Sequence, residues 1–259
     1  MSTAASQSRG VSPTRDPAAW PLILLVTLAG GCWAVTVKRM HGMDMGPGTN
    51  LGGLGWFAVV WLTMMAAMML PSLSPMALAH ARAAPRGRAR SIAGTFSFAA
   101  GYMLPWAAFG LLAYMLVDGV RALEIGFLDW QRAGRYVAGG VIVAAALYEL
   151  TPPKARSLQR CRDFRPLRRR AGLLGALAMG VEQGWFCVGC SGAMMAALFA
   201  LGVMSIPWML MIAALVAAEK LLPRAALATG ATAALLAVLG LAILLVPDQV
   251  PWLTIPMQM

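Results

Sequence analysis

Two cysteines separated by two residues lie in the apolar stretch EQGWFCVGCSGAMM. Positions i, i+3 and i+7 share one face of a helix, so we expect Cys187, Cys190 and Met194 to form a single stripe of sulfur side chains. Thiolate and thioether sulfurs are soft ligands that favour Cu(I). Cysteine and methionine also pack membrane helices as small or pliable apolar residues, so the spacing alone leaves simple packing open.

A second group of sulfurs occurs in the stretch WLTMMAAMMLP. Met64/Met68 and Met65/Met69 are i, i+4 pairs, which places thioethers on two adjacent stripes of one helix. Counted along spanning helices from opposite faces, Met68 lies roughly 21 Å from the outer face and Cys190 roughly 9 Å from the inner face, about the same level in a 30 Å hydrocarbon core. Neighbouring helices would therefore bring these sulfurs into one buried site. Core packing is an equal alternative, because the chain has 19 methionines.

A third group lies in the glycine-rich stretch KRMHGMDMGPG, which we expect outside the membrane between the first two spans. Met40, His41, Met43 and Met45 have no packing reason to gather in a water-exposed loop. Thioether and imidazole ligands suit copper and offer little to magnesium or calcium, which prefer oxygen. The pattern predicts a flexible segment that captures Cu(I), with a loop of chance composition as the alternative.

The composition of the chain indicates that these sulfurs lie in a membrane protein. The chain is 59% apolar and 12% charged, with a mean hydropathy of +0.70, which is typical of a polytopic membrane protein. We expect an all-α membrane helical bundle of about seven transmembrane helices, with six as the alternative. The predicted spans are 18–37, 54–78, 92–117, 134–151, 184–203, 206–222 and 225–246. They form one transmembrane domain, 18–246, between an uncleaved N-terminal tail, 1–17, and a C-terminal tail, 247–259.

The net charge of +11 is concentrated beside predicted spans, which argues against nucleic acid as a partner. Clusters of arginine and lysine beside spans mark cytoplasmic loops and favour contact with the lipid bilayer. We therefore expect a multi-pass protein of the bacterial inner membrane with a cytoplasmic N-terminus. The basic residues are Arg82, Arg86, Arg88 and Arg90 after the second span, and Lys154, Arg156, Arg160, Arg162, Arg165, Arg168, Arg169 and Arg170 after the fourth.

The segment 172–204 is too long for one ordinary span and contains Glu182, which is costly at mid-membrane. One long tilted helix is one solution. A surface segment that turns into a span near Gly184 is the other, and we favour it because it keeps Glu182 at the inner interface.

Five motifs together resemble a bacterial family of predicted metal-binding integral membrane proteins, a domain of unknown function sometimes described as a copper chaperone. They are WLTMMAAMMLP, GYMLPW, LYELTPPK, CVGC and AAEKLLP, in this order between about residues 40 and 224. The resemblance implies a membrane protein that binds a metal, with copper as the expected one.

The chain departs from the pattern of that family at two positions. The family has a second cysteine directly after the CxxC motif, where this chain has Ser191, and a C-L-x-x-C motif, where this chain has Ser157 and Cys161. The paired loss implies that the two missing cysteines act together, as a disulfide or as shared ligands. The site is then either weakened or built from Cys161, on a cytoplasmic loop, with the CxxC pair and a methionine.

These observations predict a protein that binds Cu(I) and either delivers it to a copper-receiving protein or moves it across the membrane. The alternative is a membrane thiol-disulfide oxidoreductase using Cys187 and Cys190, which would need a second, outer cysteine pair where only Cys32 is present. Because the sequence contains no nucleophile–base pair, phosphate loop or dinucleotide fingerprint, we do not expect an enzyme. No inverted repeat or intramembrane carboxylate pair supports a transporter of small solutes.

Overall fold

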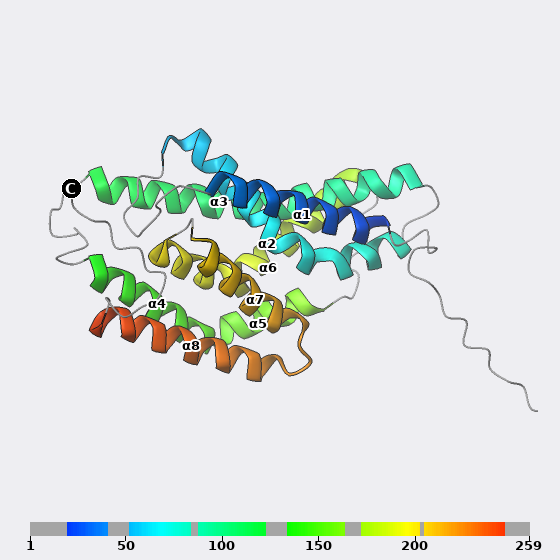
Figure 1. Cartoon of the computed structure of the whole chain (residues 1–259). Helices are drawn as coiled ribbons and strands as arrows, with labels where there is room; N and C mark the ends of the chain where they lie inside the picture. The colour runs from blue at the N-terminus through cyan, green and yellow to red at the C-terminus, as the bar shows by residue number, and fades with distance from the viewer. Residues whose placement is uncertain are drawn as a thin grey trace, which may run out of the picture.

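The computed structural model describes residues 20–40, 52–83, 88–122, 134–163, 172–202 and 205–246. Helices account for all the regular secondary structure in these residues. The all-α prediction is therefore confirmed. The helices are α1 (Trp20–Met40), α2 (Leu54–Ala83), α3 (Arg88–Ala122), α4 (Arg135–Glu149), α5 (Pro152–Arg162), α6 (Gly172–Leu201), α7 (Ile206–Leu221) and α8 (Ala225–Leu245). Figure 1 shows α1, α2 and α3 along one side of the molecule, α4, α5 and α8 along the other, and α6 and α7 between them.

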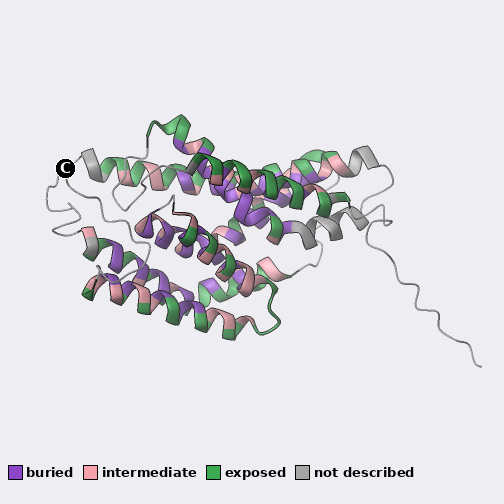
Figure 2. Ribbon diagram, viewed as in Figure 1, coloured by how far each residue is buried: buried purple, intermediate pink, exposed green. Residues whose placement is uncertain are grey.

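Five of these helices, α1, α2, α3, α6 and α8, are long and apolar enough to cross a membrane. The other two predicted spans correspond to α4 and α7, which are shorter, at 15 and 16 residues. Exposed residues, in green, lie along the outward faces of the helices (Figure 2). Many of them are large and apolar, such as Leu112 and Leu116 of α3 and Leu227 and Val238 of α8, as expected of helices whose outer faces meet lipid.

α6 lies at the centre of the bundle, where it packs against α3, α4, α5 and α7. It runs without a break from Gly172 to Leu201, so the favoured prediction of a separate surface segment ending near Gly184 is wrong. Glu182 is exposed on the helix surface, and the neutral Gln183 takes the buried position, so the helix can continue without burying a charge. At 1.5 Å per residue, 30 residues extend about 45 Å, longer than a hydrocarbon core of about 30 Å.

α5 is a helix where the sequence predicted a loop, and it carries Cys161 in its last turn. Thr151 has an extended backbone because it precedes a proline. Pro152 has no backbone N–H to continue α4, and it occupies the first turn of α5, where that N–H is not needed. Polar and basic residues dominate α5, so it lies outside the candidate spans. Its position brings Cys161 back against α6.

Glycines allow α3 and α6 to approach with their backbones almost in contact. A methyl group added to Gly101 would collide with the carbonyl oxygen of Leu177, and one added to Gly180 would collide with that of Phe98. One turn further along α6, a methyl group on Gly184 would lie 2.6 Å from the carbonyl oxygen of Tyr102. Small residues at such positions are the usual means of close helix packing in membranes.

Gly180→Ala is expected to separate α3 from α6 and to lower stability by about 1–3 kcal/mol, the usual cost of overpacking. Thermal unfolding of the purified protein in detergent would measure this loss. Gly94→Ala, on α3 where an added methyl group meets no atom within 4 Å, is the matched control and should leave the unfolding temperature unchanged or slightly raised. Equal unfolding temperatures for the two variants would contradict the proposed role of this close approach.

Candidate metal centre

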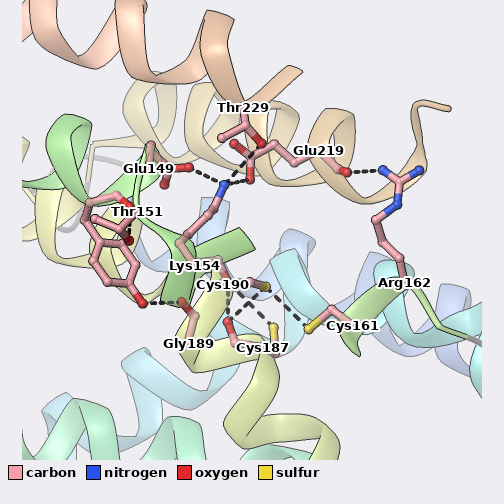
Figure 3. A network of polar contacts seen from close by, with 12 residues as sticks. Glu149, Thr151, Lys154, Cys161, Arg162, Cys187, Gly189, Cys190, Glu219 and Thr229 are labelled. Atoms are coloured by element: carbon pink, nitrogen blue, oxygen red, sulfur yellow. Dashed lines mark hydrogen bonds and ion pairs between the residues drawn. The ribbon is translucent and has the colours of Figure 1, made fainter. Parts of the chain in front are cut away.

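Three cysteine sulfurs from two helices meet beside the middle of α6. The Sγ atoms of Cys161, Cys187 and Cys190 all lie within 4.8 Å of one another, and those of Cys161 and Cys190 are 3.4 Å apart (Figure 3). Cys187 and Cys190 are each only 1% exposed, whereas Cys161 is half-buried. The predicted single face for the CxxC pair thus agrees with the structure, and α5 contributes the third sulfur. We call these residues the cysteine triad.

One methionine of α2 reaches the cysteine triad. The Sδ atom of Met69 lies 4.0 Å from Cys187 Sγ, so α2 and α6 meet through these two side chains. The other predicted methionines, Met64, Met65, Met68 and Met194, are buried in the surrounding hydrophobic core. Their role as ligands stays a prediction.

Cys187 is the best-hydrogen-bonded sulfur of the triad. The Tyr102 hydroxyl lies 2.9 Å from its Sγ atom, and the Lys220 ammonium, from α7, donates to it at 3.0 Å. The Lys220 nitrogen also lies 3.9 Å from Met69 Sδ and 3.3 Å from the hydroxyl of Ser72. A cationic donor beside a sulfur stabilises the thiolate form, which is the form that binds metals.

Cys161 differs from Cys187 in its electrostatic surroundings. Hydrogen bonds with the Cys187 and Cys190 thiols, together with burial, raise the pKa of the Cys161 thiol well above its usual value. A metal that binds this sulfur must therefore displace a proton from it.

A buried ion cluster lies directly beside the triad. The Lys154 ammonium is fully buried and contacts a carboxylate oxygen of Glu149 and, at 2.6 Å, one of Glu219, with the Thr229 hydroxyl 3.5 Å away (Figure 3). We call Glu149, Lys154 and Glu219 the carboxylate–lysine cluster. It joins α4, α5 and α7, because each of these helices contributes one of its three charges.

Two further contacts hold α5 and α4 in register with the site. Arg162 donates to the backbone oxygens of Glu219 and Leu222, which are left without intrahelical partners at the end of α7. The Tyr148 hydroxyl donates to the carbonyl oxygen of Gly189, between the two cysteines of the CxxC motif, at 2.7 Å.

Glu219 and Lys220, consecutive on α7, point to different clusters. Glu219 binds Lys154, and Lys220 binds Cys187. Both side chains are therefore part of the site. The signals for these residues, and for Glu149, Lys154 and Tyr102, were present in the motifs LYELTPPK, GYMLPW and AAEKLLP, where charged or hydroxyl groups interrupt apolar helices.

Of the two serines that depart from the resemblance described above, Ser191 belongs to α6 and Ser157, on α5, packs against α6. Ser191 Oγ is 3.6 Å from Cys187 Sγ, and Ser157 Oγ packs against Gly189, where an added methyl group would lie 2.7 Å from it. A thiol at position 191 would therefore adjoin Cys187. Met40, His41, Met43 and Met45 lie outside the residues whose side chains the structure describes, and their predicted role in capture stays a prediction.

The donor set at the triad fits a soft, low-coordinate metal. Three thiols and one thioether converge, with no imidazole or carboxylate in the cluster of potential ligands found among the described residues. Such sulfur ligands select Cu(I), whereas a structural zinc site usually has four Cys or His ligands.

Lys154→Met should destabilise the protein by about 3–5 kcal/mol, because it leaves two buried carboxylates without a counterion. Denaturation of the detergent-solubilised protein would measure the loss. The triple variant Lys154→Met/Glu149→Gln/Glu219→Gln, which removes all three charges, should recover most of it. Arg156→Met, exposed on the same helix, is the matched control and should have little effect. A triple variant as unstable as the single one would show that charge burial is not the cause.

Comparison with known families agrees with this chemistry. A search of curated proteins and a search of solved structures each find no match. A family model described as "PpoB2: Copper chaperone" matches residues 58–243, which include α3 to α7 completely, most of α2 and α8, the cysteine triad and the carboxylate–lysine cluster. The chain therefore belongs to the PpoB2 family of copper chaperones.

Proposed function

We propose that this protein binds Cu(I) as cargo through Cys161, Cys187 and Cys190, with Met69 as a fourth sulfur, and passes it to a copper-requiring protein. The observation that carries the proposal is the meeting of three thiols from two helices within 4.8 Å. Membership of a copper chaperone family supports copper as the metal and a client protein as the recipient. Delivery of copper requires no reaction catalysed by the protein itself.

Lys220 offsets part of the negative charge that the site gains when copper binds. Each thiol that binds copper loses a proton and becomes an anion, and several buried anions would be costly without compensation. Cu(I) supplies one positive charge, and the Lys220 ammonium, 3.0 Å from Cys187 Sγ, supplies another. Tyr102 adds a neutral donor to the same sulfur.

We further propose that α4 and α7 cross the membrane with the five longer helices, which gives seven spans in a single transmembrane domain, 18–246, between tails 1–17 and 247–259. Both helices are apolar and pack on spanning helices, α4 on α8 and α6, and α7 on α8 and α6. The basic segment around α5 then faces the cytoplasm of a bacterial cell, as does the N-terminus. The methionines and histidine at 40–45 then face outward and form a separate copper-binding segment.

One observation favours the alternative function of a thiol-disulfide oxidoreductase, namely the 3.4 Å distance between Cys161 Sγ and Cys190 Sγ. This pairing differs from the CxxC pair that the sequence suggested. A redox enzyme would cycle this pair through a disulfide, whereas a copper carrier keeps it reduced. The metal-binding measurement below separates the two.

Cys187→Ser/Cys190→Ser should lower Cu(I) affinity by at least about tenfold, since loss even of groups that only support metal ligands costs that much. The measurement is anaerobic competition of the purified protein with a chromophoric Cu(I) chelator. Cys32→Ser, at a cysteine of α1 outside the triad, is the matched control and should bind like wild type. Unchanged affinity in a folded double variant would refute the proposed site. Absence of copper from the wild type would favour the redox function.

Ser191→Cys should strengthen Cu(I) binding by about tenfold, equivalent to about 1.4 kcal/mol, because it adds a thiol next to Cys187. The serine oxygen already lies 3.6 Å from Cys187 Sγ. Ser97→Cys, on α3 against the start of α6, adds a thiol away from the triad and should leave the affinity unchanged. Equal gains for both variants would mean that the added thiol binds copper anywhere on the protein.

A further inference from the structure

A layer of aromatic side chains closes the bundle on one side of the cysteine triad. Trp61 is in ring contact with Phe57, Phe109 and Phe199, at centroid distances of 6.0, 6.1 and 5.1 Å, and Trp106 contacts Phe109 at 5.8 Å. The Trp61 indole nitrogen donates to the Trp106 carbonyl oxygen at 2.8 Å, which ties α2 to α3. Phe57, Trp61 and Trp106 are at most 2% exposed, so the centre of the layer is tightly packed.

The aromatic layer lies away from α5. On α2, Trp61 precedes Met69 by eight residues, about 12 Å, and on α6 Phe199 follows Cys187 by twelve, about 18 Å. Between these levels the helices carry the fully buried Met65, Met194 and Met195. An approach to the triad from this side is therefore blocked by tightly packed side chains.

The other side of the triad is formed by α5, which lies outside the candidate spans. Cys161, in its last turn, is the one triad residue with a partly exposed side chain. Arg156 and Arg160 are exposed on the same helix, and Arg160 stacks over the ring of Phe186, next to Cys187 in the chain. Their positive charge attracts anionic ligands, such as thiolate complexes of Cu(I).

We propose that Cu(I) enters and leaves the triad only from the α5 side, by ligand exchange at Cys161. This inference rests on the proposed function and specifies the side from which the copper site is accessible. A thiolate of the copper-accepting molecule forms a bond to Cu(I) while the bond from Cys161 Sγ to Cu(I) breaks, and further acceptor thiolates then replace Cys187 and Cys190 in the same way. Each released cysteine takes up a proton, and copper remains Cu(I) throughout. Loading is the reverse, so both steps occur on one face of the membrane. The protein is in that case a store and donor for that face and not a path across the bilayer.

The first test of sidedness needs no copper. A variant that keeps Cys161 and has Ser at Cys32, Cys187 and Cys190 is treated with a membrane-impermeant maleimide in inside-out and in right-side-out membrane vesicles. Labelling is expected in inside-out vesicles alone, where the predicted cytoplasmic face is accessible. The matched variant that keeps only Cys187 should stay unlabelled in both. Labelling of Cys161 from the opposite face, or of Cys187 from either face, would overturn one-sided access.

The second test follows the metal. Vesicles of both orientations containing Cu(I)-loaded wild-type protein are mixed with a membrane-impermeant sulfonated Cu(I) chelator, and the absorbance of the chelator complex gives the removal rate. Removal is expected only in inside-out vesicles. In Cys161→Ser the copper that is still bound should leave about tenfold more slowly, which corresponds to about 1.4 kcal/mol in the exchange barrier. Cys32→Ser is the control and should match wild type.

The possible outcomes separate this inference from the function on which it rests. Equal removal from both faces would mean that access to the copper site is not one-sided. Removal from Cys161→Ser at an equal or higher rate would mean that Cys161 is not the exchange ligand, even though copper binds. A wild type that binds no Cu(I) would refute the proposed function. The maleimide result would then still report which face reaches Cys161.

Discussion

The neutralisation of charge inside an apolar bundle is the constraint on which the rest of the site depends. The Lys154 ammonium is fully buried and is stable there because carboxylates from α4 and α7 bind it. Unpaired charges in this environment would cost several kcal/mol each, so these helices cannot shift independently. The same contacts fix α5, which carries Cys161 less than two turns after Ser157, the residue that packs on Gly189. A cluster that takes no part in sulfur chemistry thereby sets the positions of the sulfurs.

Two adjacent residues of α7 connect the ionic and the sulfur chemistry. Glu219 is bound by Lys154 through its side chain and by Arg162 through its backbone oxygen, so its position along the helix axis is fixed. Lys220 is the next residue, and its ammonium donates to Cys187 Sγ. A rotation or slide of α7 would break both contacts at once, and the electrostatic state of Cys187 therefore depends on the ion cluster.

The sequence predicted the membrane bundle, the CxxC face and the approach of one methionine, because hydropathy and helical periodicity are local properties. It did not predict α5, since a short helix of mostly polar residues has too few apolar positions to stand out from a loop, nor the unbroken α6, since the side of the helix that Glu182 faces depends on its neighbours. The convergence of Cys161 with Cys187 and Cys190 depends on tertiary packing. So does the choice of Met69 over Met65 or Met68, which the pattern treated as equivalent.

The cysteine triad contains an odd number of thiols. Three thiols can form at most one disulfide among themselves, and the 3.4 Å contact makes Cys161 and Cys190 the nearest candidates. Oxidative damage of that kind would leave Cys187 reduced, still next to Met69 and Lys220. The odd count thus leaves the protein one metal ligand that survives intramolecular oxidation, and reduction of a single disulfide would restore the complete triad.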